Sequence, residues 1–144
     1  MKNIEATVNG AQDFSIKRGD TFTKVIFQLS LGDNSNLVLH DRDKINLVLG
    51  TQVELNETPS IPTCILPGMI EDVTGQVSVV FTKEATKQLK AGTYLGELHI
   101  ERLSSDTDEN PSVAIAPSVG FFEVTITQAF DINFPDLTPL IENK

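Results

Sequence analysis

The chain is poor in the residues that build many binding sites: its 144 residues include no tryptophan, one tyrosine and one cysteine. The single cysteine, Cys64, excludes an intrachain disulfide and a cysteine-ligated zinc site. A buried thiol is the simpler reading of Cys64, since a nucleophile would need a histidine nearby. With Tyr94 as the sole Tyr or Trp, the chain lacks the aromatic platforms of most sugar sites.

Long apolar runs and basic residues are scarce as well. No stretch approaches the ~18 apolar residues of a membrane span, and the opening MKNIEATVNG has no apolar core of a secretory signal. The 11 basic residues against 20 acidic ones give a net charge of -9. This balance disfavours nucleic acid and anionic membranes as partners, because both attract clusters of Lys and Arg. We expect assembly in a cytoplasm.

Catalytic spacings are missing too. The sequence has no G-x-S-x-G, H-E-x-x-H, G-x-G-x-x-G or P-loop pattern, and its only histidines are His40 and His99. Both histidines are predicted to be ordinary surface residues. The chain is therefore predicted not to be an enzyme and to use no cofactor.

One loop offers a candidate for calcium binding. Asp106, Asp108 and Glu109 supply the hard oxygen ligands that calcium prefers, but without the glycine and full ligand set of an EF-hand. A solvated loop tip is the competing interpretation. Asp33, Asp41 and Asp43 carry the same weak signal.

What the sequence does have is strand patterning. The stretch Phe14–Leu31 alternates apolar and polar residues on both sides of Gly19-Asp20, which predicts strand, tight turn and strand. The same alternation recurs at four further places, and these segments are 45–49, 77–81, 94–100 and 122–126. Shorter strands are expected at 3–8 and 113–117, and 53–55 is expected to continue the strand 45–49 across a bend.

One short helix is predicted within Thr82–Leu89, with Thr82 as N-cap and Gly92 as the stop. Pro59, Pro62 and Pro67 make the middle of the chain a loop or an edge strand. We expect Gly96, on the inward face of its strand, to mark a bulge or a close backbone contact.

These elements predict an all-β antiparallel β-sandwich, Ig-like or jelly-roll-like, of about seven to eight strands with one short helix. The sandwich is expected to cover residues 1–127 and an apolar tail or linker residues 128–144. The tail either packs on its own domain or docks on another subunit. Its candidate interface residues are Phe130, Ile132, Phe134, Leu137, Leu140 and Ile141.

The tripeptide Arg18-Gly19-Asp20 matches the integrin-binding motif, but a match of three residues is common by chance. A turn between strands explains it better. Gly19 would supply the permissive φ angle, and Asp20 would accept hydrogen bonds from the turn backbone.

The order of these motifs resembles the N-terminal domain of phage baseplate upper proteins, from phages that infect Gram-positive bacteria. The resemblance spans about residues 12–127, and its pieces are FSIKRGDT at 14–21, the strand at 25–29, GQVSVVF at 75–81, GTYLGELHI at 92–100 and the strand at 122–124. It implies a β-sandwich that anchors to the tail hub and carries receptor-binding machinery. Such proteins continue into long helices and further domains, which residues 128–144 do not show.

The resemblance leads to an expected function. We expect a non-enzymatic structural module of a phage or prophage tail baseplate, bound to other tail proteins and to copies of itself, without nucleic acid or membrane. Its location would be the virion. The alternative is an adhesin-type β-sandwich that binds a ligand with calcium or through a glycan.

Overall fold

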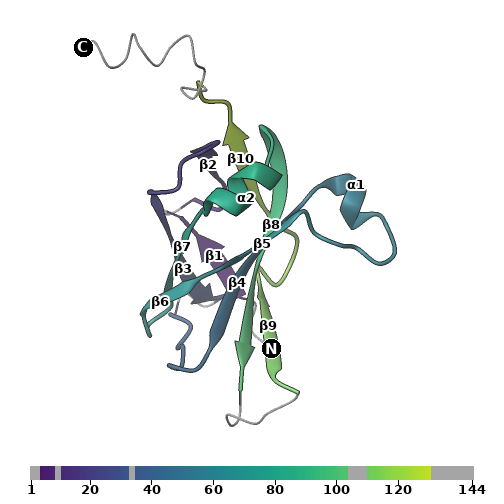
Figure 1. The fold of residues 1–144 in the computed structure, drawn as a ribbon. Helices are drawn as coiled ribbons and strands as arrows, with labels where there is room; N and C mark the ends of the chain where they lie inside the picture. The colour runs from purple at the N-terminus through teal and green to yellow at the C-terminus, as the bar shows by residue number, and fades with distance from the viewer. Residues whose placement is uncertain (1–3, 9–10, 33–34, 104–109, 131–144) are drawn as a thin grey trace, which may run out of the picture.

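A computed structural model describes residues 4–8, 11–32, 35–103 and 110–130 (Figure 1). The described residues form ten strands and two short helices. The strands are β1 (Ile4–Thr7), β2 (Phe14–Lys17), β3 (Lys24–Leu31), β4 (Lys44–Gly50), β5 (Cys64–Pro67), β6 (Met69–Asp72), β7 (Gln76–Val80), β8 (Gly92–Arg102), β9 (Ser112–Ala116) and β10 (Phe122–Thr127). The helices are α1 (Gln52–Leu55) and α2 (Lys83–Gln88).

The strands form two sheets that pack face to face. One sheet has the order β1-β3-β7-β6, and the other has the order β2-β10-β8-β4-β5, with β9 also paired to β8. These orders are those of an immunoglobulin-type sandwich, in which the first strand pairs with one sheet and its continuation with the other. The prediction of an all-β sandwich is confirmed, and the topology selects the Ig-like alternative over the jelly roll.

The chain crosses between the sheets at both sides of the sandwich. β1 and β2 are consecutive in sequence but lie in different sheets. On the opposite side, only Gly68 separates β5 from β6, and its N–H donates to the carbonyl of Ile45 at 2.8 Å. A Cβ at Gly68 would come within 3.0 Å of Ile45 Cγ2, so this crossing needs glycine. Both crossings fasten the two sheets to each other.

The core lies between the sheets and follows the alternation read from the sequence. The inward side chains of β3, β4, β7, β8 and β10 are buried. Phe14, Phe27 and Phe122 form an aromatic cluster, in which the ring centroids of Phe27 and Phe122 lie 5.5 Å apart. Gly96 lies opposite Phe122, and a Cβ there would come within 2.4 Å of the Phe122 ring. The expected bulge or close backbone contact at Gly96 is wrong: the glycine leaves room for the aromatic side chain of Phe122.

The connection between β7 and β8 closes one end of the sandwich. Thr82 caps α2, as predicted, by accepting the N–H of Ala85 at 3.2 Å, and Ala85 and Leu89 are buried. The hydroxyl of Tyr94 donates to the carbonyl of Lys90 at 2.9 Å. This contact has the geometry of a tyrosine corner, which in immunoglobulin-type folds ties the start of this strand to the turn before it.

β9 and β10 run in series along the same side of β8. Ala116 pairs with Leu98 and Phe122 pairs with Gly96, so residues 117–121 loop out of what would otherwise be one strand. Ser118 in this loop is tied to the first strand: its N–H donates to the Ile4 carbonyl at 2.9 Å, and its Oγ accepts the Ile4 N–H at 2.7 Å.

Three further details of the predicted fold are wrong. The strand count is higher because the region around Pro59, Pro62 and Pro67 and the residues just after it supply two further strands, β5 and β6. The sandwich is not wholly antiparallel, because β2 runs parallel to β10. Residues 53–55 do not extend β4; they belong to a second helix, α1, that begins directly after the strand.

No helix in the described ranges is long and apolar enough to cross a membrane.

Candidate functional site

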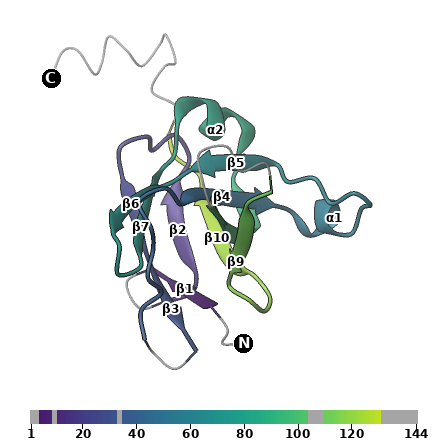
Figure 2. The ribbon, with the colours of Figure 1, turned by 90° about the horizontal axis from the view of Figure 1, so that it is seen from below.

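The surface has a groove beside a protruding arm. The arm consists of residues 51–63, which connect β4 to β5 and carry α1 away from the sandwich in both ribbon views (Figures 1 and 2). Between the arm and the outer face of the β4–β8 pair lies a cavity of about 300 Å³. We call this cavity the groove. Its lining residues are Val48, Gly50, Thr51, Glu54, Leu55, Ser60, Ile61, Pro62, Ile65, Leu95, Glu97, His99 and Phe121.

Local contacts build the arm. Thr51 and Glu54 form a capping box: the Thr51 hydroxyl accepts the Glu54 N–H at 3.2 Å, and the Glu54 carboxylate accepts the Thr51 N–H at 2.9 Å. Thr63, at the far end of the arm, donates its hydroxyl to the same carboxylate. One side chain therefore joins the beginning and the end of the arm.

The hydrogen bonds that join the two ends of the arm also change the pKa of Glu54. The hydroxyl of Thr63, the backbone N–H of Thr51 and then the Thr51 hydroxyl lower the pKa of Glu54, because they bond the charged form, against a smaller opposing effect of burial. The carboxylate is therefore charged at neutral pH and holds the base of the arm closed.

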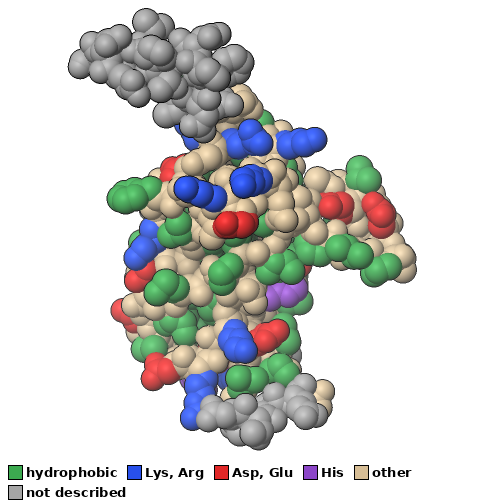
Figure 3. Space-filling view, viewed as in Figure 1, with side chains coloured by type: hydrophobic (Ala, Val, Ile, Leu, Met, Phe, Trp, Pro, Cys, Tyr) green, Lys and Arg blue, Asp and Glu red, His purple; other side chains and the backbone are tan. Residues whose placement is uncertain are grey.

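The floor of the groove is the outer face of the second sheet. Val48 and Leu95 are half-buried there, and Ile65 of β5, which pairs with Val48, is 58% exposed. Ile61 on the arm is 66% exposed, so apolar surface faces solvent on both walls. Hydrophobic side chains line the lower edge of the arm in the space-filling view (Figure 3).

Two polar side chains on the floor of the groove, Glu97 and His99, contact each other. His99 Nε2 lies 3.1 Å from Glu97 Oε1, and both side chains are partly exposed. Cys64 cannot join them, because it is buried on the core side of β5, whereas His99 lies on the outer face. Burial also raises the pKa of the Cys64 thiol, which favours the unreactive protonated form. The predicted buried thiol is confirmed.

The arrangement of the groove is suited to binding. Within the described ranges, no group of three or more His, Cys, Asp or Glu residues could hold a metal ion. A mostly apolar concave surface with a few fixed polar groups is typical of a site that binds a peptide segment or a small ligand.

None of the predicted site residues that the structure describes lines this groove. His99, predicted to be an ordinary surface residue, does line it. The calcium candidates Asp106, Asp108 and Glu109 lie outside the described residues. Of the predicted interface residues, Phe130 is described and is 97% exposed. The remaining interface residues, Ile132, Phe134, Leu137, Leu140 and Ile141, lie outside the described part of the chain.

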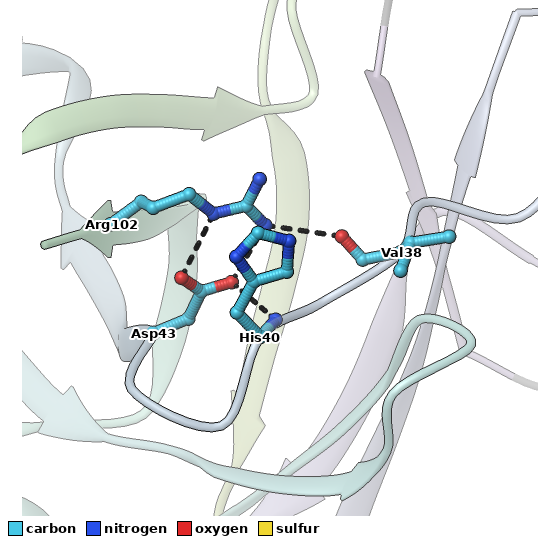
Figure 4. Close-up of polar contacts among 4 residues, drawn as sticks. All are labelled: Val38, His40, Asp43 and Arg102. Atoms are coloured by element: carbon cyan, nitrogen blue, oxygen red, sulfur yellow. Dashed lines mark hydrogen bonds and ion pairs between the residues drawn. The ribbon is translucent and has the colours of Figure 1, made fainter. Parts of the chain in front are cut away.

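Asp43 has a structural role instead of a metal-binding one (Figure 4). Arg102 donates from Nε and Nη2 to the two Asp43 carboxylate oxygens at 3.0 and 2.8 Å, and from Nη2 to the Val38 carbonyl at 3.1 Å. The His40 N–H donates to Asp43 at 2.9 Å. Burial alone would raise the pKa of Asp43, but the bonds from Arg102 and His40 outweigh it and lower the pKa.

The Arg18-Gly19-Asp20 turn is confirmed as a structural device. Gly19 has a φ of 91°, and Asp20 accepts the N–H groups of Phe22 and Thr23 at 3.0 and 2.8 Å. Arg18 Nε donates to the carbonyl of Leu89 at 3.1 Å, next to α2. Both charged side chains of the tripeptide are therefore engaged within the fold.

Sequence reasoning missed the groove. Its walls come from the arm, β4, β5 and β8, and only the pairing of these strands brings them together. One local signal was available: Thr51-x-x-Glu54 is a capping-box pattern, which marks the start of a helix directly after β4.

Comparisons with known proteins add little. No family model matches the chain, and no curated protein matches it. Among solved structures, it is similar to AggA, the major subunit of aggregative adherence fimbriae type I from Escherichia coli, with a TM-score of 0.31 and 11% identity over 88% of this chain and 95% of that chain. Similarity at this level supports no inference about function, and the fold described above rests on the strand order.

Proposed function

We propose that this chain is a non-enzymatic structural module of a phage or prophage tail baseplate, which binds neighbouring tail proteins through the groove. The order of the strand motifs supports the baseplate context. The groove supports the mode of binding, and it is the observation that carries the proposal.

The chemistry of the groove indicates what it binds. Ile61, Ile65, Leu55 and Phe121 offer apolar surface, and two carboxylates, Glu54 and Glu97, lie among them. The lining, as far as the structure describes it, includes no Lys or Arg. The partner segment is therefore apolar and carries a basic side chain, which can approach the two carboxylates. A negative net charge of -9 attracts such a partner from a distance.

In the assembled virion the module links the tail hub to the receptor-binding machinery. The stable sandwich serves as the scaffold, and several copies are arranged around the tail. This role requires exposed binding surfaces and no catalytic group.

The test is binding of the full chain to the purified tail proteins encoded beside it, measured by calorimetry. Wild type binds one of them, and Ile65→Asp weakens that binding by at least about tenfold, because a carboxylate would be buried in an apolar contact. Val119→Asp is the matched control: Val119 is 75% exposed but lies outside the groove, so binding is kept. Failure to bind any of these proteins, or equal loss in both variants, contradicts the proposal.

A further inference from the structure

β9 has an edge that is open over part of its length, since β1 lies near it and Ile4 bonds Ser118 just beyond its end. β9 pairs with β8, and no strand in the described ranges pairs with its other side. The direction of its backbone groups follows from the neighbouring strand β10. There the N–H of Glu123 points away from β8 and donates to the carboxylate of Asp13 at 2.8 Å, so the groups of Phe122 and Val124 face β8.

The same alternation continues along β8, because successive residues of a strand direct their N–H and C=O groups to opposite sides. Gly96 faces β10, so Leu98 and Ile100 face β9, where they pair with Ala116 and Ala114. The N–H and C=O groups of Val113 and Ile115 therefore point to the open edge.

The side chains at this edge are apolar and exposed. Val113 is 53% and Ile115 40% exposed, and Ile115 pairs with the groove residue His99. The edge thus continues the apolar outer face of the groove. An open edge with apolar side chains and free hydrogen-bonding groups is a template for a further strand.

The chain itself contains a matching segment. Phe130, Ile132 and Phe134 alternate with Asp131 and Asn133, and Pro135 follows. This five-residue strand pattern is as long as β9, and proline ends it because proline cannot continue a ladder. Phe130, the one described member, is 97% exposed and so has no cover in its own domain.

We propose that residues Phe130–Phe134 of one copy add as a strand to the open edge of β9 in a second copy. The backbone groups of Val113 and Ile115 bind the added strand, and its apolar side chains extend the outer face. The inference deepens the proposed function, on which it rests, by naming how copies of the module join.

Geometry excludes the same pairing within one chain. Ile126, near the end of β10, pairs with Gly92, whereas Ala114 in the middle of β9 pairs with Ile100. These positions are eight residues apart along β8, or about 26 Å. Ile132 is only six residues beyond Ile126 and reaches at most about 22 Å, before any reversal of the chain. The segment can reach β9 only in another copy.

Such a contact is heterologous, since each copy gives a segment from one end and receives one at β9. Two copies that exchange their segments form a closed two-fold dimer, whereas one-way addition from copy to copy produces a ring or a filament.

The test uses two full-length variants and light scattering after size exclusion. Ile115→Pro removes an N–H of the open edge and spares the β8 ladder, whereas Ile115→Thr keeps that N–H and is the control. The second variant replaces Phe130, Ile132 and Phe134 by Ser. We expect wild type and Ile115→Thr to self-associate, and each blocked variant to weaken association by at least about tenfold. A mixture of the two blocked variants forms a one-to-one dimer, because each supplies what the other lacks.

Four outcomes overturn this inference. They are a wild type that stays monomeric at all concentrations, a serine variant that associates like wild type, a mixture that stays monomeric, and loss of association on Leu140→Ser but not on Ile132→Ser. If only Ile115→Pro blocks association, two β9 edges pair directly instead. None of these results bears on whether the groove binds other tail proteins, so the two proposals fail separately.

Discussion

The sandwich and the arm are held by different kinds of contact. In the sandwich, partners are distant in sequence: Arg102 bonds Asp43, Arg18 bonds the carbonyl of Leu89, and both sheets share one core. In the arm, no residue of α1 is buried, and Glu54 bonds residues within nine positions of itself. The difference separates two tasks: the sandwich keeps the fold, and the arm can change without unfolding it.

Truncating a leucine in each region should give the largest contrast. Leu89→Ala removes a side chain that is 1% exposed in the closed end of the sandwich, so we expect a loss of about 2–5 kcal/mol in unfolding free energy. Leu55→Ala on the arm, where 36% of the residue is exposed, should cost less than about 1 kcal/mol. Urea unfolding measures both. Equal losses would mean that the arm is part of the core.

Acid should act on the sandwich through Asp43. Its pKa is lowered in the folded protein, so its stabilising contribution is full above the ordinary value of 3.8 and is lost as pH falls through the lower, folded value. Asp43→Asn should cost about 2 kcal/mol at pH 7, because charged hydrogen bonds to Arg102 are lost, and should flatten the decline of stability below pH 4.

Urea unfolding at a series of pH values between 7 and 2 checks this expectation. The exposed neighbour Asp41 provides the control: Asp41→Asn should change stability by less than about 0.5 kcal/mol and should leave the decline in acid as it is. If the Asp43 variant lost stability in acid as wild type does, the ion pair between Asp43 and Arg102 would not be the cause of that loss.

The smallest effect on global stability is expected at Glu54. Glu54→Gln weakens the bonds from Thr51 and Thr63, so the arm should be cleaved several-fold faster by protease, while unfolding free energy falls by less than about 1 kcal/mol. Because the pKa of Glu54 is lowered, acid should open the arm of wild type in the same way as pH falls below the ordinary range. Glu57→Gln, on the same arm, should leave the cleavage rate unchanged.

Much of the fold could be predicted from local pattern. Alternation located β3, β4, β7, β8 and β10, and Thr82 located the start of α2. Gly96 was expected to mark a bulge or a close backbone contact, and the structure shows that the ring of Phe122 fills the space beside it. These features follow from side-chain shape and burial, which the sequence records directly.

Other features could not be predicted because they depend on pairing. Three such features join residues far apart in sequence. They are the parallel pairing of β2 with β10, the crossing between the sheets at Gly68, and the arrangement of β9 and β10 in series along β8. The capping pattern of Thr51 and Glu54 could have indicated the start of α1. However, an apolar stretch directly after a strand is equally typical of a longer strand. The tail, by contrast, was singled out from composition, and the interface role predicted for it stays a prediction.

The sequence by itself determined an all-β domain with these inward faces, since a period of two leaves only one way to bury Phe27, Leu47 and Val79. It also determined the turn at Gly19-Asp20, which is built from its own residues. The tertiary structure alone decided which strands meet, and therefore the groove, the Asp43–Arg102 pair and the open edge of β9. Each of these joins segments whose approach is set by the packing of the whole core, which no local stretch of sequence encodes.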